Sequence, residues 1–155
     1  MQLVDSHKHL GFILDSKMDY SYHIDIKISK ANQAICVIKR LYKYLPRKSL
    51  LQIYKSFVRP HLDYCDVIYH KPTYDDFYRS CYSERSQTDP INTNSQFTCK
   101  IESVQYNACL AISGCVRGTS REKLYAELGL TSLYDRRRFH RLKHFYKIKN
   151  NLTPE

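Results

Sequence analysis

The sequence lacks the features that mark secreted and membrane-spanning proteins. No apolar run approaches the length of a transmembrane helix. The first residues also lack the long apolar core of a signal peptide. We therefore expect an intracellular protein, in the cytoplasm or the nucleus, with no membrane among its partners.

The six cysteines include no Cys-x-x-Cys pair. Structural zinc sites usually contain such pairs, because two close thiolates help to fix the tetrahedral geometry of the metal. We therefore predict no metal ligands among the cysteines. Free thiols, buried or partly buried, are the expectation for a reducing compartment.

Motifs of catalysis are also missing. The sequence has no G-x-G-x-x-G motif and no P-loop. His140 and His144 have the four-residue spacing of two metal ligands on a helix, but no Glu lies between them and cations surround them. We interpret them as part of a solvated basic face, and we predict no catalytic residue, no metal ligand and no cofactor on this chain.

Acidic residues are scarce relative to basic ones. The 25 Lys and Arg exceed the 15 Asp and Glu, which gives a formal net charge of +10. Such an excess favours a polyanionic partner, most often nucleic acid and less often an anionic membrane surface. The alternative is a domain whose surface charge only keeps it in solution. A length of 155 residues and an apolar fraction of 43% suit one globular domain.

The hydrophobic pattern predicts a mainly α fold with about five helices and a short N-terminal β-strand or hairpin. Residues 9–15 have the pattern of a strand, with a tight approach at Gly11. A helix over residues 22–44 carries an apolar stripe at spacings of three and four, and a second helix over residues 47–59 should pack antiparallel to it. The expected contacts of this pair are Ile24, Ile28, Ile35, Ile38, Leu50, Ile53 and Phe57.

Pro60 should end or kink the second helix, because proline lacks an N–H and clashes with the preceding turn. Residues 71–100 lack apolar periodicity, and we predict a polar, flexible loop there. Further helices should follow over residues 101–155. Their signals are an apolar stripe (Ile101, Val104, Ala108, and Ala111 or Ile112), C-terminal glycines (Gly114, Gly129), capping pairs (Thr119 with Glu122, Ser132 with Asp135) and late apolar positions (Phe139, Leu142, Phe145, Tyr146).

Two basic clusters are the positive functional signal. The first surrounds the junction of the first two helices, with Tyr42 and Tyr44 among its cations, and the second lies on the last helix. Lys and Arg can neutralise phosphates, and tyrosines can stack on sugars or bases. We predict that both clusters bind nucleic acid, although cations that merely solubilise the chain remain the alternative. The candidate residues are Lys39, Arg40, Lys43, Arg47, Lys48, Arg136, Arg137, Arg138, Arg141 and Lys143.

Seven short segments resemble, in the same order, the region after the polymerase active site in jockey-like non-LTR retrotransposon reverse transcriptases, which are RNA-directed DNA polymerases. Lys55-Ser-Phe-Val-Arg-Pro-His-Leu-Asp-Tyr64 is one of these segments. The others cover residues 9–15, 28–32, 45–50, 101–108, 117–124 and 128–137. The resemblance implies a remnant of the last palm strands at 1–18, a thumb-like segment at 19–70 and a C-terminal helical segment at 101–155. The loop predicted at 71–100 is longer than the family would lead us to expect.

The same resemblance implies a truncated reverse transcriptase that keeps the non-catalytic part that binds the template–primer duplex. Its partners would be RNA or an RNA–DNA duplex, held by phosphate contacts, and the missing fingers and palm of the parent polymerase. Asp75-Asp76 follows Tyr74 directly, whereas the catalytic box of the family has one residue between the aromatic residue and the acids. We interpret the pair as surface acid, so this chain should not polymerise, and Mg would belong to the missing palm. The alternative is an independent, host-recruited basic helical module that binds RNA or protein.

Overall fold

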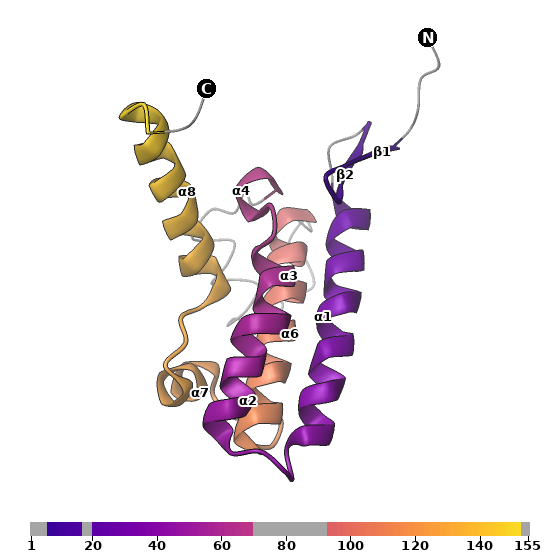
Figure 1. The fold of residues 1–155 in the computed structure, drawn as a ribbon, viewed down its shortest axis with the longest axis vertical. Helices are drawn as coiled ribbons and strands as arrows, with labels where there is room; N and C mark the ends of the chain where they lie inside the picture. The colour runs from indigo at the N-terminus through magenta and orange to yellow at the C-terminus, as the bar shows by residue number, and fades with distance from the viewer. Residues whose placement is uncertain (1–5, 17–19, 70–92, 153–155) are drawn as a thin grey trace, which may run out of the picture.

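The computed structural model describes residues 6–16, 20–69 and 93–152, and it is mainly helical with one antiparallel β-hairpin at its N-terminal end (Figure 1). The sequence-based prediction of the fold class is therefore confirmed. The elements are β1 Ser6–His9, β2 Phe12–Asp15, α1 Ser21–Leu41, α2 Arg47–Ile53, the π-helical turn η1 Tyr54–Val58, α3 Arg59–Asp63, α4 Asp66–Tyr69, α6 Thr93–Ser113, α7 Arg121–Leu128 and α8 Leu133–Lys149.

The strand expected at residues 9–15 is instead a hairpin, because Leu10 and Gly11 form its turn. Both residues have positive φ, 47° and 82°, which suits the two-residue turn that joins twisted antiparallel strands. The partner strand is the preceding segment, in a register that pairs His9 with Phe12. Sequence reasoning missed β1 because all four of its residues are exposed and show no apolar alternation.

The hairpin is attached to the helices through a buried aromatic cluster. The ring of Phe12 lies 4.3 Å from that of His23 and 5.5 Å from that of Tyr20, between centroids. Tyr69 at the end of α4 stacks on the same phenylalanine at 6.5 Å. His23 Nδ1 also accepts a hydrogen bond from the N–H of Ile13, at 3.3 Å. These contacts join β2, α1 and α4 at one end of the bundle.

Helix α1 buries the stripe that its sequence predicts, with Ile24, Ile35 and Ile38 in the core and Ile28 half-buried. Helices α2 and α3 run antiparallel to it, as expected, and α6 lies behind them in Figure 1. Tyr54, Val58, Ala108 and Ile112 join the same core.

Pro60 does not end the second helical segment, which continues through α3 to Asp63. The chain accommodates the proline with η1, where the N–H of Arg59 donates to the carbonyl of Tyr54 five residues earlier. A wider turn of this kind relieves the clash that a proline ring makes with the carbonyl four residues before it. The turn also changes which side chains face inward. Phe57, expected in the core, is 64% exposed, and the buried positions are instead spaced by four: Leu50, Tyr54, Val58 and Leu62.

Helix α6 begins at Thr93, so the last eight residues of the expected 71–100 loop are helical. The remainder of that loop, with Asp75 and Asp76, lies outside the described residues. The apolar stripe of α6 is confirmed at four positions, because Ile101, Val104, Ala108 and Ile112 are all buried.

Three of the expected helix ends are confirmed, at Gly114, Gly129 and Ser132. Gly129 ends α7 with φ +60°, and its N–H donates to the carbonyl of Ala126 at 3.2 Å. Gly114 follows α6 with φ +73°, and a side chain there would collide with the ring of Tyr42, which lies against it. The hydroxyl oxygen of Ser132 accepts from the N–H of Asp135 at 3.1 Å and caps α8. The capping box expected between Thr119 and Glu122 is wrong, because α7 starts after Ser120 and the Thr119 hydroxyl donates to a carbonyl, that of Val116.

Helix α8 leaves the bundle after its first two turns (Figure 1). Leu133 and Tyr134 are buried at its start, but the later apolar positions that the sequence indicates for this helix, Phe139, Leu142, Phe145 and Tyr146, are 59–66% exposed. In the described part of the chain, no helix is long and apolar enough to cross a membrane.

Candidate functional site

The junction between α1 and α2 presents an exposed basic surface. Residues 26–62 contain no Asp or Glu at all. The cations near the end of α1 and the start of α2 are exposed, and so are the two tyrosines of the connection; Tyr44 is 81% exposed. We call this set the junction surface, and it consists of Lys39, Arg40, Tyr42, Lys43, Tyr44 and Lys48.

Arg47, predicted to bind nucleic acid with this group, is already engaged within the fold. Its guanidinium pairs with the carboxylate of Glu127 on α7 and donates to the carbonyl of Ser113 at 3.1 Å. That carbonyl belongs to the last turn of α6, where orphan C=O groups attract a cation. Arg47 therefore ties α2 to α6 and α7.

The second predicted cluster divides into structural and exposed arginines. Arg137 is 2% exposed, donates to the carbonyl of Leu62 at 2.8 Å and lies over the ring of Tyr69 at 5.5 Å. Arg136 donates from Nε to Asp63 Oδ2, also at 2.8 Å. These two side chains hold α8 against α3 and α4, so the prediction that they bind phosphates is not supported by their contacts. The exposed members of the cluster, which we call the α8 cations, are Arg138, Arg141 and Lys143.

The junction surface and the α8 cations do not form one face. In Figure 1 the α1–α2 connection lies at the lower end of the long axis, whereas α8 extends towards the upper end. A nucleic acid would therefore contact either the junction surface or the α8 cations. To contact both, it would have to extend along the whole length of the molecule.

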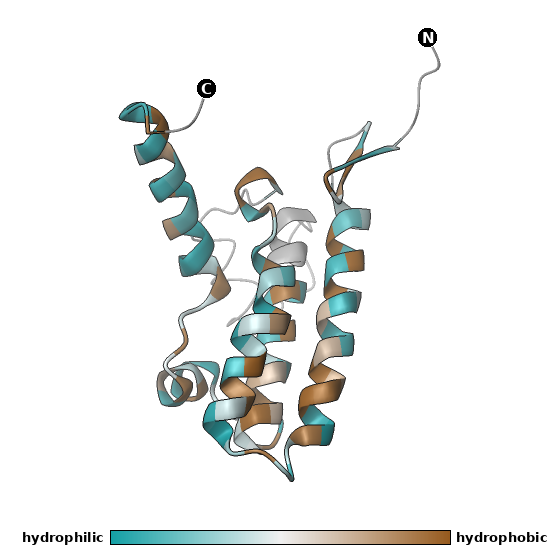
Figure 2. Cartoon of the chain, in the orientation of Figure 1, coloured by the Kyte–Doolittle hydropathy of each residue, from teal (hydrophilic) through white to brown (hydrophobic). Residues whose placement is uncertain are grey.

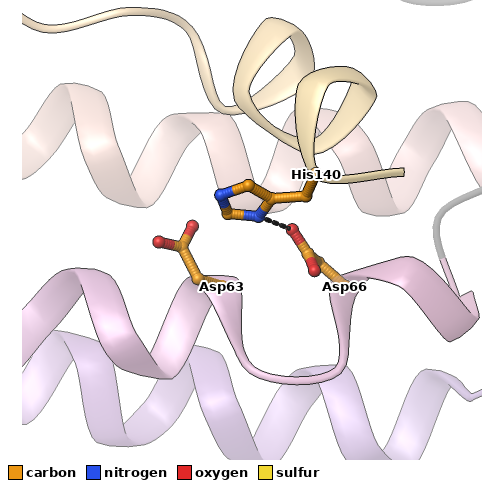
Figure 3. A group of neighbouring side chains, drawn as sticks. All are labelled: Asp63, Asp66 and His140. Atoms are coloured by element: carbon orange, nitrogen blue, oxygen red, sulfur yellow. Dashed lines mark hydrogen bonds and ion pairs between the residues drawn. The ribbon is translucent and has the colours of Figure 1, made fainter. Parts of the chain in front are cut away.

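Two aspartates and a histidine meet where α8 crosses the end of α3 (Figure 3). Asp66 is buried, and its Oδ2 lies 2.8 Å from His140 Nδ1. Asp63 lies beside this pair, and the three side chains offer ligand atoms within 4.8 Å of one another. By ligand type the group could hold a divalent cation.

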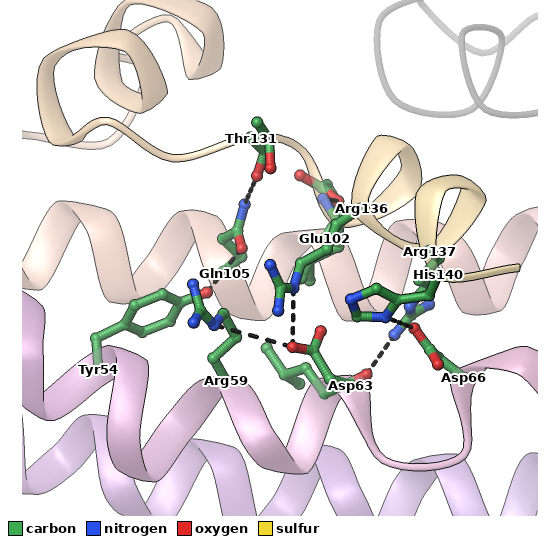
Figure 4. A network of polar contacts seen from close by, with 12 residues as sticks. Tyr54, Arg59, Asp63, Asp66, Glu102, Gln105, Thr131, Arg136, Arg137 and His140 are labelled. Carbon is green, nitrogen blue, oxygen red and sulfur yellow. Dashed lines mark hydrogen bonds and ion pairs between the residues drawn. The ribbon is translucent and has the colours of Figure 1, made fainter. Parts of the chain in front are cut away.

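The surrounding charges favour an ion-pair network over a metal site. Asp63 Oδ2 already accepts from Arg136, and Arg59 Nε lies 3.9 Å from the same oxygen. Arg137 adds a third guanidinium nearby (Figure 4). Three arginines balance the carboxylates, and a dication would be repelled by them. Sequence reasoning placed His140 on a solvated face, whereas the structure pairs it with Asp66; His144 is exposed.

A second polar network lies inside the bundle, on α6. Glu102 is buried and accepts from the hydroxyl of Tyr125 at 2.8 Å and from the N–H of Leu133 at 3.1 Å. Burial raises the pKa of this carboxyl, and its two hydrogen bonds oppose that shift. Since each oxygen has a donor, the group serves to join α6, α7 and the start of α8.

Gln105, one turn further along α6, makes a similar connection. Its amide oxygen accepts from the hydroxyl of Tyr54 at 2.7 Å, and its amide nitrogen donates to the carbonyl of Thr131 at 2.9 Å (Figure 4). Sequence reasoning missed both Glu102 and Gln105. The sequence does contain one indication of their burial. Glu102 and Gln105 directly follow Ile101 and Val104 of the apolar stripe, on a helix that is surrounded by protein.

The buried thiol of the core is poorly suited to chemistry. Burial, and to a smaller extent nearby Glu102, raises the pKa of Cys109 to about 12. A thiol of this kind stays protonated at neutral pH and is a weak nucleophile. Cys36, Cys65 and Cys115 are also free. Cys65 and Cys115 are partly buried, as the sequence predicts, whereas Cys36 is exposed.

The buried charges of the described residues are paired, and the two clusters identified from the sequence keep exposed cations at the junction surface and on α8. Buried Asp66, Glu102 and Arg137 are all engaged in maintaining the fold. Among the described residues, the junction surface and the outer part of α8 are exposed and can contact a partner. Comparison of the chain with protein-family models, with curated proteins and with solved structures finds no match.

Proposed function

We propose that this chain is the non-catalytic, duplex-binding part of a reverse transcriptase of the jockey-like non-LTR type, and that it contacts the nucleic-acid backbone through the junction surface. The resemblance of the seven sequence segments motivates the family. The observation that carries the binding function is the exposed, acid-free group of Lys39, Arg40, Lys43 and Lys48.

Cations in this arrangement suit a polyphosphate. They lie on the last turn of one helix, on the short connection and on the first turn of the next, so they project from a rigid corner of the bundle. Tyr44 stands among them with an exposed ring that can pack on sugars or bases, and the partly exposed ring of Tyr42 lies beside it in the chain, against Gly114. Contacts to phosphate carry no sequence information, so binding should be independent of sequence.

The test is a titration of a labelled RNA–DNA hybrid at several salt concentrations, followed by fluorescence anisotropy. The wild-type affinity should fall steeply with salt, because each neutralised phosphate releases condensed counterions. Replacement of Lys39, Arg40, Lys43 and Lys48 by Gln should lower the slope of log K against log salt by roughly three to four, since each contact contributes roughly 0.9 on B-DNA.

A matched variant separates a specific surface from net charge alone. Lys8, Lys30, Lys147 and Lys149 are also exposed, and their replacement by Gln removes the same charge outside the junction surface. This variant should keep nearly the wild-type slope. Equal slopes for the two variants would show that the junction surface is not the binding site, and the absence of binding at low salt would refute the proposed function.

The alternative, an independent module that binds a protein, is favoured by a different observation. The outer part of α8 exposes large apolar side chains that a phosphate backbone would not cover.

A further inference from the structure

The outer part of α8 is exposed on all sides. Every residue from 141 to 152 is exposed, together with Arg138 and Phe139. The contacts that attach the helix come from its first two turns, through Leu133, Arg137 and His140. Within the part of the chain that the structure describes, its later turns therefore form a helical rod that extends from the bundle with exposed side chains.

The exposed apolar side chains of this rod form two rows. Phe139, Leu142 and Tyr146 are spaced by three and four residues, so they lie along one line of the helix. Phe145 and Ile148 form a second line, roughly a third of a turn away around the axis. All five are more than half exposed. Burial of such rings and branched chains is the usual source of affinity when a helix binds in a groove.

Cations separate and flank the two rows. Arg138 and Lys149 lie between them by helical geometry, and Lys143 and Lys147 lie beyond the first row. Residues 136–152 include seven Lys and Arg and no acid. In Figure 2 the helix is accordingly mostly hydrophilic, with hydrophobic positions distributed along it. The apolar side chains thus share one half of the circumference, with Arg138 and Lys149 among them, whereas Lys143 and Lys147 lie on the other half.

Hydrogen bonds also cap the C-terminal end of the rod. At its end the N–H of Leu152 donates to the carbonyl of Lys147 at 2.9 Å, and the N–H of Asn151 donates to that of Ile148 at 3.2 Å. With Asn151 at φ +50°, this is the paired hydrogen bonding of a Schellman motif. A helix capped at both ends is already ordered before it binds. Binding to a partner therefore costs little conformational entropy.

We infer that the outer part of α8 is a docking helix for a protein groove that is apolar inside and rimmed with carboxylates, the chemistry of the Ca²⁺-loaded EF-hand sensors. Such grooves bind basic amphipathic helices through apolar anchors at helical spacing. Their flexible, Met-rich lining adapts to anchors of different shape. A groove that encloses the helix can cover both rows at once while its carboxylates pair with the cations between them.

Other occupants fit these observations less well. A second copy of the outer part of α8 would bring its five cations against five others, which repel. A flat anionic membrane would bring Arg138 and Lys149, which lie between the two apolar rows, into its apolar layer. A duplex would pair with the cations but would leave the apolar rows in water. The inference does not rest on the proposed function, because the junction surface lies at the other end of the molecule.

The experiment measures binding of the full chain to Ca²⁺-loaded calmodulin, used as the probe for a groove of this chemistry, by isothermal titration calorimetry. Binding is expected in Ca²⁺ and should disappear when a chelator closes the groove. Truncation of Phe139, Leu142 and Tyr146 to Ala should weaken it by roughly a hundredfold, as the loss of several anchors does. These positions are exposed, so the variant should fold as the wild type does.

A control variant carries three exposed apolar truncations elsewhere, Val37→Ala, Phe57→Ala and Val116→Ala, and should bind calmodulin with unchanged affinity. The inference is overturned if no Ca²⁺-dependent binding occurs, or if both variants bind equally well. It is also overturned if anionic vesicles of phosphatidylcholine and phosphatidylserine bind the chain more tightly than calmodulin does, or if sedimentation shows a dimer that the α8 truncations dissociate. The junction-surface variant should bind calmodulin normally, so failure of the duplex proposal leaves this result unaffected.

Discussion

Acidification should destabilise the fold through one buried histidine, His23. Its ring is almost completely buried among Phe12, Tyr64 and Tyr69. Its Nδ1 accepts from the N–H of Ile13, so this nitrogen must be unprotonated, and its Nε2 is buried with no partner among the described residues. An imidazolium at this place would lose its acceptor role and would bury a charge without a counter-ion.

Burial, and to a smaller extent nearby Lys27, lowers the pKa of His23 from 6.5 to about 4. The unfolded chain then binds a proton that the folded chain does not, between about pH 6.5 and about pH 4. Stability contributed by this group is therefore complete near neutral pH and is lost as the pH falls through that window. With 1.36 kcal/mol for each pKa unit, the loss amounts to about 2 kcal/mol between about pH 7 and about pH 4.5.

Urea unfolding followed by circular dichroism at a series of pH values measures this effect. Other groups titrate in the same range, so the reference is His23→Gln, which cannot be protonated but retains an acceptor for Ile13. The free energy of unfolding of the wild type should fall by about 2 kcal/mol more than that of the variant over the range. Parallel pH dependence of the two proteins would refute the reasoning.

Three further substitutions test the core, a helix end and the attachment of α8. Ile35→Asp should unfold the chain, because it places an unpaired carboxylate in the core at a cost of several kcal/mol, and thermal melting would detect it. Gly114→Ala should lower the melting temperature more than Gly129→Ala: both glycines have positive φ, but only the first lies against a tyrosine ring. Arg137→Leu should cost about 2 to 4 kcal/mol in urea unfolding, because it leaves buried polar groups without their partner, whereas exposed Arg138→Leu should change stability by less than about 0.5 kcal/mol.

The sequence predicts the fold well where apolar residues repeat at one period. Ile24, Ile35 and Ile38 on α1 are buried as their spacing indicates. The prediction for Phe57 was wrong because η1 inserts a wider turn, which apolar spacing alone does not reveal. Proline at position 60 was a signal of irregularity, but it did not distinguish a broken helix from a continuous one with a π turn.

The sequence identifies the basic candidates only as a group. It does not distinguish the exposed cations from those that are engaged within the fold. Arg136 and Arg47 look like their exposed neighbours, because the carboxylates that engage them, Asp63 and Glu127, lie 73 and 80 positions away in the chain. Only the tertiary structure brings such partners together. Arg137 is the clearest case, since its burial depends on the position of Tyr69 and of a carbonyl in α3.

The attachment of α8 at one end makes this helix a lever. From His140 to Asn150 it extends about 15 Å, at 1.5 Å per residue. A tilt of about 10° at the contacts with Asp63 and Asp66 would displace its tip by about 3 Å. A force on the exposed tip would be transmitted along the helix to those ion pairs. A partner bound far from the bundle could therefore strain the network that joins α3, α4 and α8.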